Sequence, residues 1–412
     1  VNDAQDKVLC FDLTFAPLVE AIAAKCKTIK HWVAMTDRAH MPTQKIPNLI
    51  CYEDWLEAES DQYEWPEFDE RSACTLCYTS GTTGNPKGVI ITGENLMFAT
   101  QGLLKAMPAV GQERFFSYLP LAHAFERGAV ELASIYLGGE VWFLENLDKL
   151  AEQLKEVAPT RFYGVPLVYN RIQSGVLKKM PQAKLDRLMK IPLLSSLIKR
   201  KIKKAMGLQN ARYLFVGAAP MPIPLMHWFE KIGITVLQGY GMTENNIYAT
   251  ASLPGANRIG AVGRAMPGAD MRLAEDGEIQ FRHPGVTLGY YKDKDKTDEL
   301  FTADGWLRTG DKGRVDEDGY LYITGRVKDI FKTLKGKYVA PAPIEGALSR
   351  NTDIDQLCFV GAGLKQPIMI VTLAQPVSKP REEIEKGLIA DMEAVNAKLE
   401  AHEQIAKIIV AK

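Results

Sequence analysis

Short runs of β-branched and aromatic residues alternate with longer segments of helical periodicity up to about residue 250. The expected strands are residues 141–145, 161–166 and 211–220, and the expected helices are residues 147–157 and 224–233. Apolar residues recur at helical spacing in both helices, and a glycine, which is a common stop signal, ends the second. Strands that alternate with helices in this way predict βαβ units on mainly parallel sheets, and therefore an α/β fold.

The pattern changes after about residue 258. Short strands separated by Gly, Asp and Pro turns fill residues 258–325, which predicts a small antiparallel β subdomain. A smaller α/β unit follows it. We therefore expect a large domain over residues 1–326, which ends with the β subdomain, and a small mobile C-terminal domain over residues 327–412.

The segment YTSGTTGNPKG (78–88) concentrates hydroxyl groups, glycines and one lysine directly after the apolar run ACTLC. Glycines let the backbone approach a ligand closely, and several N–H and O–H donors on one loop form an anion cradle. The predicted phosphate-binding residues are Thr79, Ser80, Gly81, Thr82, Thr83, Gly84 and Lys87. The order differs from the Walker A loop, in which lysine directly follows the second glycine. Taken alone, the segment fits either a site for a nucleotide polyphosphate or a flexible surface loop.

Composition and charge narrow the functional classes. The 412 residues carry 50 basic and 50 acidic side chains, so the net charge gives no support to nucleic-acid binding. The six scattered cysteines fit a reduced, cytoplasmic chain, and the lone pair Cys74 and Cys77 lacks the second ligand pair of a zinc site. No apolar run is long enough to cross a bilayer.

Residues 175–206 form a basic stretch in which Asp186 is the single acid among ten lysines and arginines. Leucine, isoleucine and methionine residues interleave with these charges. A basic amphipathic segment can lie on an anionic membrane surface, which would give peripheral contact at the inner face of the membrane. The plainer alternative is a solvated insertion on the α/β domain, and both interpretations stay open.

The loop at residues 78–88 resembles the phosphate loop of the adenylate-forming superfamily, which includes acyl-CoA synthetases, adenylation domains and luciferases. Further motifs follow in that family's order: LPLAHAFER (119–127), GAAP (217–220), QGYGMTE (238–244), TGD (309–311) and KGKYVAPAPIE (335–345). The resemblance covers nearly the whole chain from about residue 70. The residues of its motifs are most similar to those of long-chain fatty acid–CoA ligases. Ligands of parallel sheets lie at the carboxyl ends of strands, so we expect the phosphate loop, GAAP and GYGMTE to face one cleft.

This resemblance implies an ATP-dependent, AMP-forming ligase that activates a medium- or long-chain fatty acid as an acyl-adenylate and passes the acyl group to coenzyme A. It implies ATP, Mg²⁺ and coenzyme A as co-substrates and ion. Thr243 would then donate to the α-phosphate, and Glu244 would ligate Mg²⁺, a hard cation that suits a carboxylate. Tyr240 and Gly241 would lie against adenine. The backbone of Gly217 and Ala218 would approach the other side of the base.

The remaining motifs receive roles from the same resemblance. Asp311 and Arg326 would bind the ribose hydroxyls, and His123 would lie near the carboxylate and the acyl pocket. Lys328 would be the hinge at which the small domain turns between two half-reactions. Gly336 would line the pantetheine channel of coenzyme A.

The sequence departs from the family in one respect. The family places a catalytic lysine on a loop near its C-terminus, and we find no matching loop before Lys412. We therefore expect a piece of a longer protein, cut at both ends, with impaired adenylation. Two alternatives stay open: an acyl-AMP ligase that loads a carrier protein, and a nucleotide- or acyl-binding module without turnover. The sequence leaves the acyl chain length and the oligomeric state open.

Overall fold

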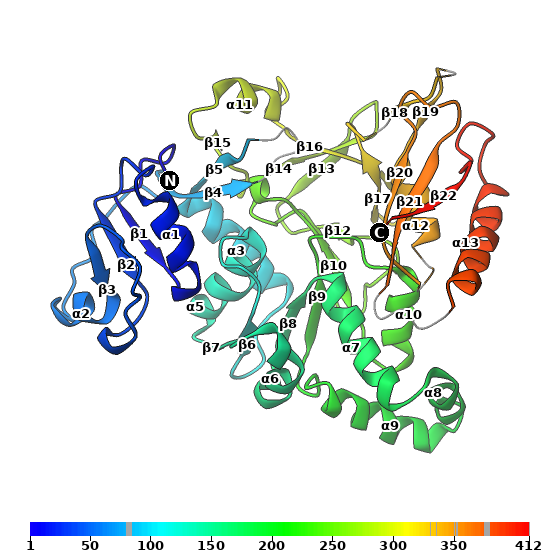
Figure 1. Cartoon of the computed structure of the whole chain (residues 1–412), viewed down its shortest axis with the longest axis horizontal. Coiled ribbons are helices and arrows are strands. Elements are labelled where there is room, and N and C mark those ends of the chain that lie inside the picture. The colour runs from blue at the N-terminus through cyan, green and yellow to red at the C-terminus, as the bar shows by residue number, and fades with distance from the viewer. Residues whose placement is uncertain are drawn as a thin grey trace.

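The structure, a computed structural model, describes residues 1–79, 85–329, 331–334, 336–349, 351, 353–374 and 380–411, apart from the side chain of Leu193. Figure 1 shows a central large sheet with helices around it, a small N-terminal sheet at one side and a second α/β unit at the other. This arrangement confirms the predicted α/β class.

A seven-stranded sheet forms the centre, in the order β12-β11-β10-β9-β8-β6-β7. The strands from β10 to β7 run parallel to one another, and β11 and β12 continue the sheet antiparallel. The bounds are β6 Arg114–Ser117, β7 Glu140–Phe143, β8 Arg161–Gly164, β9 Tyr213–Val216, β10 Leu237–Tyr240, β11 Thr250–Ala251 and β12 Arg264–Ala265. The predicted strands at 141–145, 161–166 and 211–220 are thus β7, β8 and β9.

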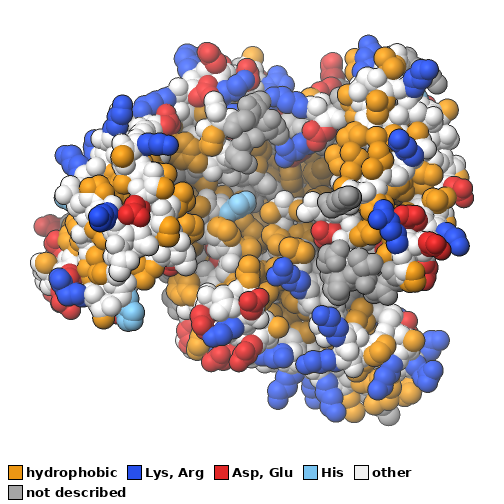
Figure 2. All heavy atoms as spheres, viewed as in Figure 1, with side chains coloured by type: hydrophobic (Ala, Val, Ile, Leu, Met, Phe, Trp, Pro, Cys, Tyr) orange, Lys and Arg blue, Asp and Glu red, His pale blue; other side chains and the backbone are white. Residues whose placement is uncertain are grey.

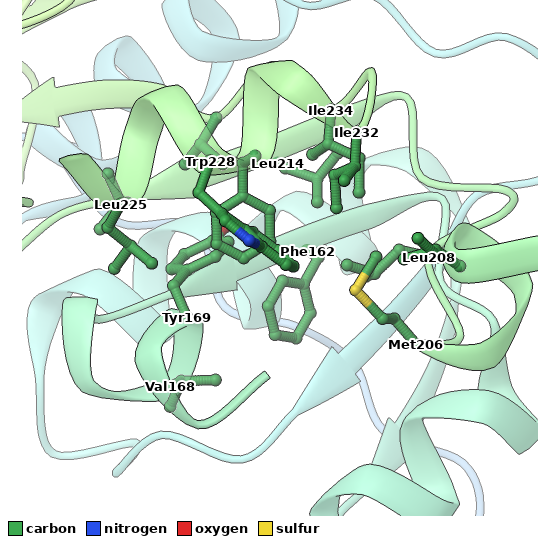
Figure 3. Packing of buried hydrophobic residues seen from close by; sticks show 14 of the residues in the cluster. Phe162, Val168, Tyr169, Met206, Leu208, Leu214, Leu225, Trp228, Ile232 and Ile234 are labelled. Carbon is green, nitrogen blue, oxygen red and sulfur yellow. The ribbon is translucent and has the colours of Figure 1, made fainter. Parts of the chain in front are cut away.

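Helices cover both faces of this sheet because successive strand residues point to opposite sides. Phe162 belongs to the core under α7 and α10, whereas its neighbour Tyr163 belongs to the core under α3. Figure 3 shows Phe162, Tyr169 and Trp228 packed together in the first core. The helices are α3 Gly93–Ala106, α4 Ala124–Glu126, α5 Ala133–Leu137, α6 Leu150–Val157, α7 Pro166–Lys179, α8 Gln182–Met189, α9 Pro192–Ala205 and α10 Ile223–Lys231.

The segment that contains the predicted phosphate loop is a β-hairpin and not part of a βαβ unit. Strands β4 (Ala73–Thr79) and β5 (Lys87–Thr92) form an antiparallel hairpin, which β15 (Gly289–Tyr290) extends on the other side of β5. The loop therefore joins two hairpin strands, and helix α3 begins only after β5. The capping box between Thr92 and Asn95 starts this helix, so the hairpin, and not a helix N-terminus, carries the loop.

A four-stranded antiparallel sheet, in the order β13-β14-β16-β17, stands where the β subdomain was predicted. Its strands are β13 Asp270–Leu273, β14 Glu278–Arg282, β16 Leu307–Val315 and β17 Leu321–Arg326. Helix α11 (Lys294–Leu300) interrupts the strands, which the turn-rich pattern did not predict. The predicted domain boundaries themselves stay a prediction.

Two smaller units lie at the ends of the chain (Figure 1). The N-terminal unit is a parallel sheet of β1 Val8–Phe11, β2 His31–Ala34 and β3 Leu49–Cys51, with α1 Ala16–Ala23 and α2 Tyr52–Glu57. The C-terminal unit contains β18 Phe331–Lys332, β19 Tyr338–Val339, α12 Pro341–Leu348, β20 Ile354–Val360, β21 Ile368–Leu373, α13 Arg381–Asn396 and β22 Ile408–Val410. In the described ranges, each helix falls short of the length and apolar character that a membrane span requires.

Candidate active site

A cavity of about 640 Å³ lies at the carboxyl ends of β9 and β10. The ends of β4 and β5, helix α11 and residues 326–329 complete its wall. Figure 2 shows the molecule hollowed between its centre and the C-terminal unit. The predicted residues in the lining are Thr79, Lys87, His123, Gly217, Ala218, Tyr240, Gly241, Thr243, Glu244, Arg326 and Lys328.

The end of the cavity that carries the predicted phosphate-binding residues Thr79 and Lys87, hereafter the phosphate end, is built on the β4–β5 hairpin. Thr79 and Lys87 are paired across the two strands, so both side chains stand where the hairpin opens into the cavity. The Lys87 ammonium lies 4.8 Å from the ring centroid of Tyr290, a cation–π contact that holds the charge at the cavity wall. The other predicted loop residues lie outside the described residues: Ser80, Gly81, Thr82, Thr83 and Gly84.

Glu244 and Thr243 begin a short 3₁₀ turn directly after β10. The Tyr290 hydroxyl donates a hydrogen bond of 2.7 Å to Oε1 of the buried Glu244 carboxylate. Burial, followed by the negative charge of Glu244, raises the pKa of Tyr290, so the phenol remains a donor at neutral pH. Lys87, Tyr290 and Glu244 therefore form one connected group at the phosphate end.

Tyr240 and the TGD motif meet through Asp311. The Tyr240 hydroxyl donates to Asp311 Oδ2 at 2.7 Å, and Arg326 Nε lies 3.1 Å from Asp311 Oδ1. Asp311 and Arg326 are also paired across β16 and β17. Burial raises the pKa of Asp311, while the bonds from Tyr240 and Arg326 oppose this shift. The two residues predicted to bind ribose thus contact each other, and Arg326 is the one that reaches the cavity lining.

Gly217 and Ala218 leave β9 at the cavity. Ala218 has a φ of +64°, a left-handed conformation that non-glycine residues seldom adopt. A Cβ on Gly217 would lie 3.5 Å from Phe125 and 3.8 Å from the Gly239 carbonyl, so the backbone there is close to its neighbours. This turn brings main chain, rather than bulky side chains, to the cavity surface.

His123 precedes the short helix α4 and caps it. Its Nδ1 accepts a hydrogen bond of 3.3 Å from the Phe125 amide, which fixes the plane of the ring. His123 is part of the cavity lining, and its place near the fatty-acid carboxylate stays a prediction.

Glu126, the last residue of α4, is a buried acid behind the cavity lining that sequence reasoning missed. Its side chain is 1% exposed, and Oε1 accepts hydrogen bonds from Ser117 Oγ at 2.6 Å and from the Tyr118 amide at 3.2 Å. Burial raises the pKa of Glu126 to about 7. The carboxyl group therefore ties the end of β6 to the helix that follows His123. An acid two residues after an alanine in LPLAHAFER carries no local sign of such burial.

Helix α11 adds two charged residues to the lining that the sequence did not identify, Lys296 and Glu299. Their side chains form an ion pair of 2.6 Å. The hydrogen bond from Lys296, with weaker contributions from Lys328 and Lys87, lowers the pKa of Glu299. Three lysines therefore gather around one acid at the phosphate end. The charge-rich run KDKDKTDEL was the available signal, but its position beside the hairpin depends on the pairing of β15 with β5.

An apolar wall forms a further part of the cavity lining. Its members come from α3, the π-helical segment η3 (Arg127–Leu132), the sheet strands and the loop after β10. They are Leu103, Phe125, Ala129, Tyr163, Phe215, Ile247, Tyr248 and Met266. Charged and apolar groups thus share one continuous space.

The structure separates Gly336 from this cavity. Gly336 lies in the turn between β18 and β19 and is absent from the cavity lining, whereas Lys328 is part of it. Lys335 and Lys412 lie outside the described residues. The predicted pantetheine contact of Gly336 and the hinge role of Lys328 stay predictions.

The donor set near Glu244 suits a Mg²⁺ ion that is held chiefly by a nucleotide. Among the described residues, no group of three or more His, Cys, Asp and Glu side chains could hold a metal by itself. A single carboxylate together with phosphate oxygens and water is the usual coordination of Mg²⁺. Glu244 meets that requirement, because it lines the cavity near Lys87 and has a second carboxylate oxygen beside the one bound to Tyr290.

Family models match both parts of the chain. The model described as "AMP-binding enzyme" matches residues 1–291, and "AMP-binding enzyme C-terminal domain" matches residues 328–412. A long-chain-fatty-acid–CoA ligase (ACSBG2) from Gallus gallus is 32% identical over 394 residues, which cover 80% of this chain and 51% of the relative. FadD15 of Mycobacterium bovis, also named as a long-chain-fatty-acid–CoA ligase, is 35% identical over 314 residues and covers 70% and 52%. The chain spans about half the length of these curated relatives.

Solved structures share the fold. The anthranilate CoA ligase AuaEII, in complex with anthranoyl-AMP, superposes with a TM-score of 0.77 at 23% identity and covers 99% of this chain and 75% of its own. ATP-bound MatB from Rhodopseudomonas palustris superposes with a TM-score of 0.76 at 24% identity and covers 100% and 76%. At these identities the likeness concerns the fold.

Proposed function

The chain belongs to the AMP-binding enzyme family, and on that basis we propose that it carries the site of an AMP-forming fatty acid–CoA ligase. It would activate a medium- or long-chain fatty acid with ATP as an acyl-adenylate and then transfer the acyl group to coenzyme A. One observation carries the proposal: a single cavity is lined both by cations and Glu244 and by an apolar wall. A triphosphate and an aliphatic carboxylic acid can therefore meet in it.

The first step joins two anions. An oxygen of the fatty-acid carboxylate bonds to the α-phosphorus of ATP, while the bond from that phosphorus to the bridging oxygen breaks and pyrophosphate leaves. A fatty acid is already ionised at neutral pH, so no general base is needed. The protein's contribution is positioning and preorganised charge. In the second step the coenzyme A thiol loses its proton, its sulfur bonds to the acyl carbon, and AMP leaves.

The residues at the phosphate end have separate tasks in this proposal. Lys87 and Thr79 would hold the β- and γ-phosphates, and Thr243 would donate to the α-phosphate. Glu244, oriented by Tyr290, would hold Mg²⁺, which when bound neutralises phosphate charge. Because Tyr290 donates to one oxygen of Glu244, the carboxylate is already oriented before a cation arrives.

Elsewhere in the cavity lining, Tyr240 would pack against adenine, and its hydroxyl is already fixed by Asp311. Arg326, which lines the cavity beside Asp311, would reach the ribose. His123, capped onto α4, would present its ring near the fatty-acid carboxylate. In this proposal the residues for adenine, ribose and the carboxylate all belong to one cavity lining.

Exchange of radiolabelled pyrophosphate into ATP tests the first step. We expect weak exchange, in line with the impaired adenylation expected from the sequence, that depends on added fatty acid, with loss of most of it in Glu244→Gln and little change in the exposed control Glu382→Gln. Exchange that does not depend on fatty acid, or ATP binding without any exchange, would refute the proposed ligase activity. It would indicate a nucleotide-binding module instead. Addition of coenzyme A or of an acyl-carrier protein then identifies the acceptor, because only the correct one releases AMP in each turnover.

We also propose weak peripheral contact between the basic segment 175–206 and anionic lipid. In the structure the apolar residues Leu185, Ile198 and Ile202 of this segment pack into the large core, so they are unavailable to a bilayer. The remaining attraction would be electrostatic and therefore salt-sensitive. Asp186 is paired with Lys231 at 2.5 Å, which leaves the lysines and arginines to dominate this face. Flotation with anionic vesicles that persists unchanged in high salt, or that is absent in low salt, would contradict the contact.

A further inference from the structure

A second, smaller pocket of about 40 Å³ lies behind the apolar wall of the main cavity. Helix α3, the π-helical segment η3 and the loop after β10 enclose it, with side chains that include Leu96 and Leu132. Leu103, Ile247 and Tyr248 line both spaces. These three residues therefore form the partition between the cavity and the second pocket.

Tyr248 is a rigid part of this partition. Its hydroxyl donates to the Pro267 carbonyl at 2.8 Å, and its ring packs edge-on against Phe98 with centroids 5.3 Å apart. Helix α3 approaches the ring so closely that a Cβ on Gly102 would lie 2.1 Å from the hydroxyl oxygen. With this hydrogen bond, this edge-on ring contact and a helix so close, Tyr248 cannot change its rotamer without displacing α3.

The backbone of Ile247 is also fixed, and in an unusual conformation. Its φ is +56°, which β-branched residues seldom adopt, and Asn246 before it has a φ of +51°. The Ile247 amide donates to the Met242 carbonyl at 2.9 Å. A Cβ on Gly241 would lie 2.5 Å from the Ile247 Cα, so the two backbones touch only because Gly241 has no side chain. The backbone of this loop thus holds the branched side chain of Ile247 between the main cavity and the second pocket.

The side chain of Ile247 rests on the bulged helix η3. A Cβ on Gly128 would lie 3.3 Å from Ile247 Cδ1, which is closer than ordinary van der Waals contact. Gly128 belongs to the π-helical turn, and such bulges are frequent at functional sites. The thinnest point of the partition is therefore one aliphatic side chain over one glycine.

We propose that Ile247 sets the length of the fatty acyl chain by closing the second pocket to the end of the chain. This inference rests on the proposed function, because it assumes that an aliphatic chain occupies the apolar end of the main cavity. Each methylene that enters an apolar space raises affinity about fourfold, so affinity should climb with chain length until the chain reaches Ile247. Beyond that length affinity should level off.

Displacement of a fluorescent fatty acid by saturated fatty acids of increasing length tests the proposal on this chain. In Ile247→Ala, three carbon atoms leave the partition, and the plateau should move to acids about three methylenes longer. In Ile247→Phe the plateau should move to shorter acids. The matched control is Ile389→Ala on α13, whose side chain is 50% exposed, and it should keep the wild-type plateau.

ATP binding is measured for each variant to check that the substitution leaves the nucleotide site intact. If both Ile247 variants bind ATP like the wild type but keep its plateau, the partition is not formed by Ile247 and the inference is overturned. If the wild type binds fatty acids yet shows no acid-dependent pyrophosphate exchange, the proposed ligase fails while the length assay still decides the role of Ile247. A wild-type chain that binds no fatty acid overturns both.

Discussion

Replacement of Glu126 by glutamine should change how the stability of the protein depends on pH. Burial raises the pKa of Glu126 from 4.5 to about 7 in the folded chain. Because the folded-state pKa is the higher one, the stabilising effect is complete below pH 4.5 and disappears as the pH rises through about 7. The shift corresponds to about 3 kcal/mol in total, of which about 2–3 kcal/mol falls between about pH 5 and about pH 8.

Glu126→Gln removes the ionisation and keeps an oxygen for the donors Ser117 and Tyr118. The amide nitrogen replaces Oε2, which has no hydrogen-bond partner, and that cost is independent of pH. The variant should therefore gain about 2–3 kcal/mol relative to the wild type as the pH rises over this interval.

Urea unfolding followed by tryptophan fluorescence, at a series of pH values, measures this difference. Ser117→Ala is an informative companion, because loss of a hydrogen bond that lowers the pKa should move the wild-type transition to higher pH. Parallel stability curves for the wild type and Glu126→Gln would refute the reasoning. That result would mean that the carboxyl group is ionised at little cost, with its charge solvated or paired in solution.

Three further changes probe the site and its support. Tyr290→Phe should destabilise the fold by about 1–3 kcal/mol in thermal or urea unfolding, because it leaves the buried Glu244 carboxylate without its donor; unchanged stability would mean that water replaces the phenol. Lys87→Ala should weaken ATP binding about tenfold or more in calorimetry, as expected for the loss of a charged phosphate contact, and equal affinity would place the triphosphate elsewhere. Gly102→Ala should destabilise by about 1–3 kcal/mol, since its Cβ would lie 2.1 Å from the Tyr248 hydroxyl oxygen and 2.4 Å from the ring carbon Cζ; Tyr248→Ala in the same chain should recover part of that loss, and additive losses would contradict the clash.

Much of the candidate site could be predicted because its residues form short clusters at strand ends. Thr79, Lys87 and Thr243 all belong to such clusters, and the structure brings them to one cavity as expected. The backbone donors and the turn of a glycine- and hydroxyl-rich loop are local properties, but the assignment of this loop to a nucleotide came from the family resemblance of the ordered motifs. The predicted roles in binding ATP, Mg²⁺ and coenzyme A remain to be measured.

Contacts between distant segments could not be predicted in the same way. The pairing of β5 with β15 brings Tyr290 to Glu244 and places Lys296 beside the phosphate end. No local pattern in KDKDKTDEL or in the hairpin predicts that pairing, because the partner of a strand depends on packing over the whole chain. The same holds for the basic segment 175–206, whose apolar residues could equally have faced a bilayer or a core.

The sequence by itself determined the alternation of strands and helices, the positions of the ligand-facing loops and the balance of charge. These follow from periodicity and from the backbone freedom of glycine, which are properties of neighbouring residues. Only the tertiary structure decided that the predicted phosphate loop joins the strands of an antiparallel hairpin, that Glu126 is buried and that Ile247 lines both the main cavity and the second pocket. Burial and strained backbone depend on what packs against a residue, and that neighbour is usually far away in the chain.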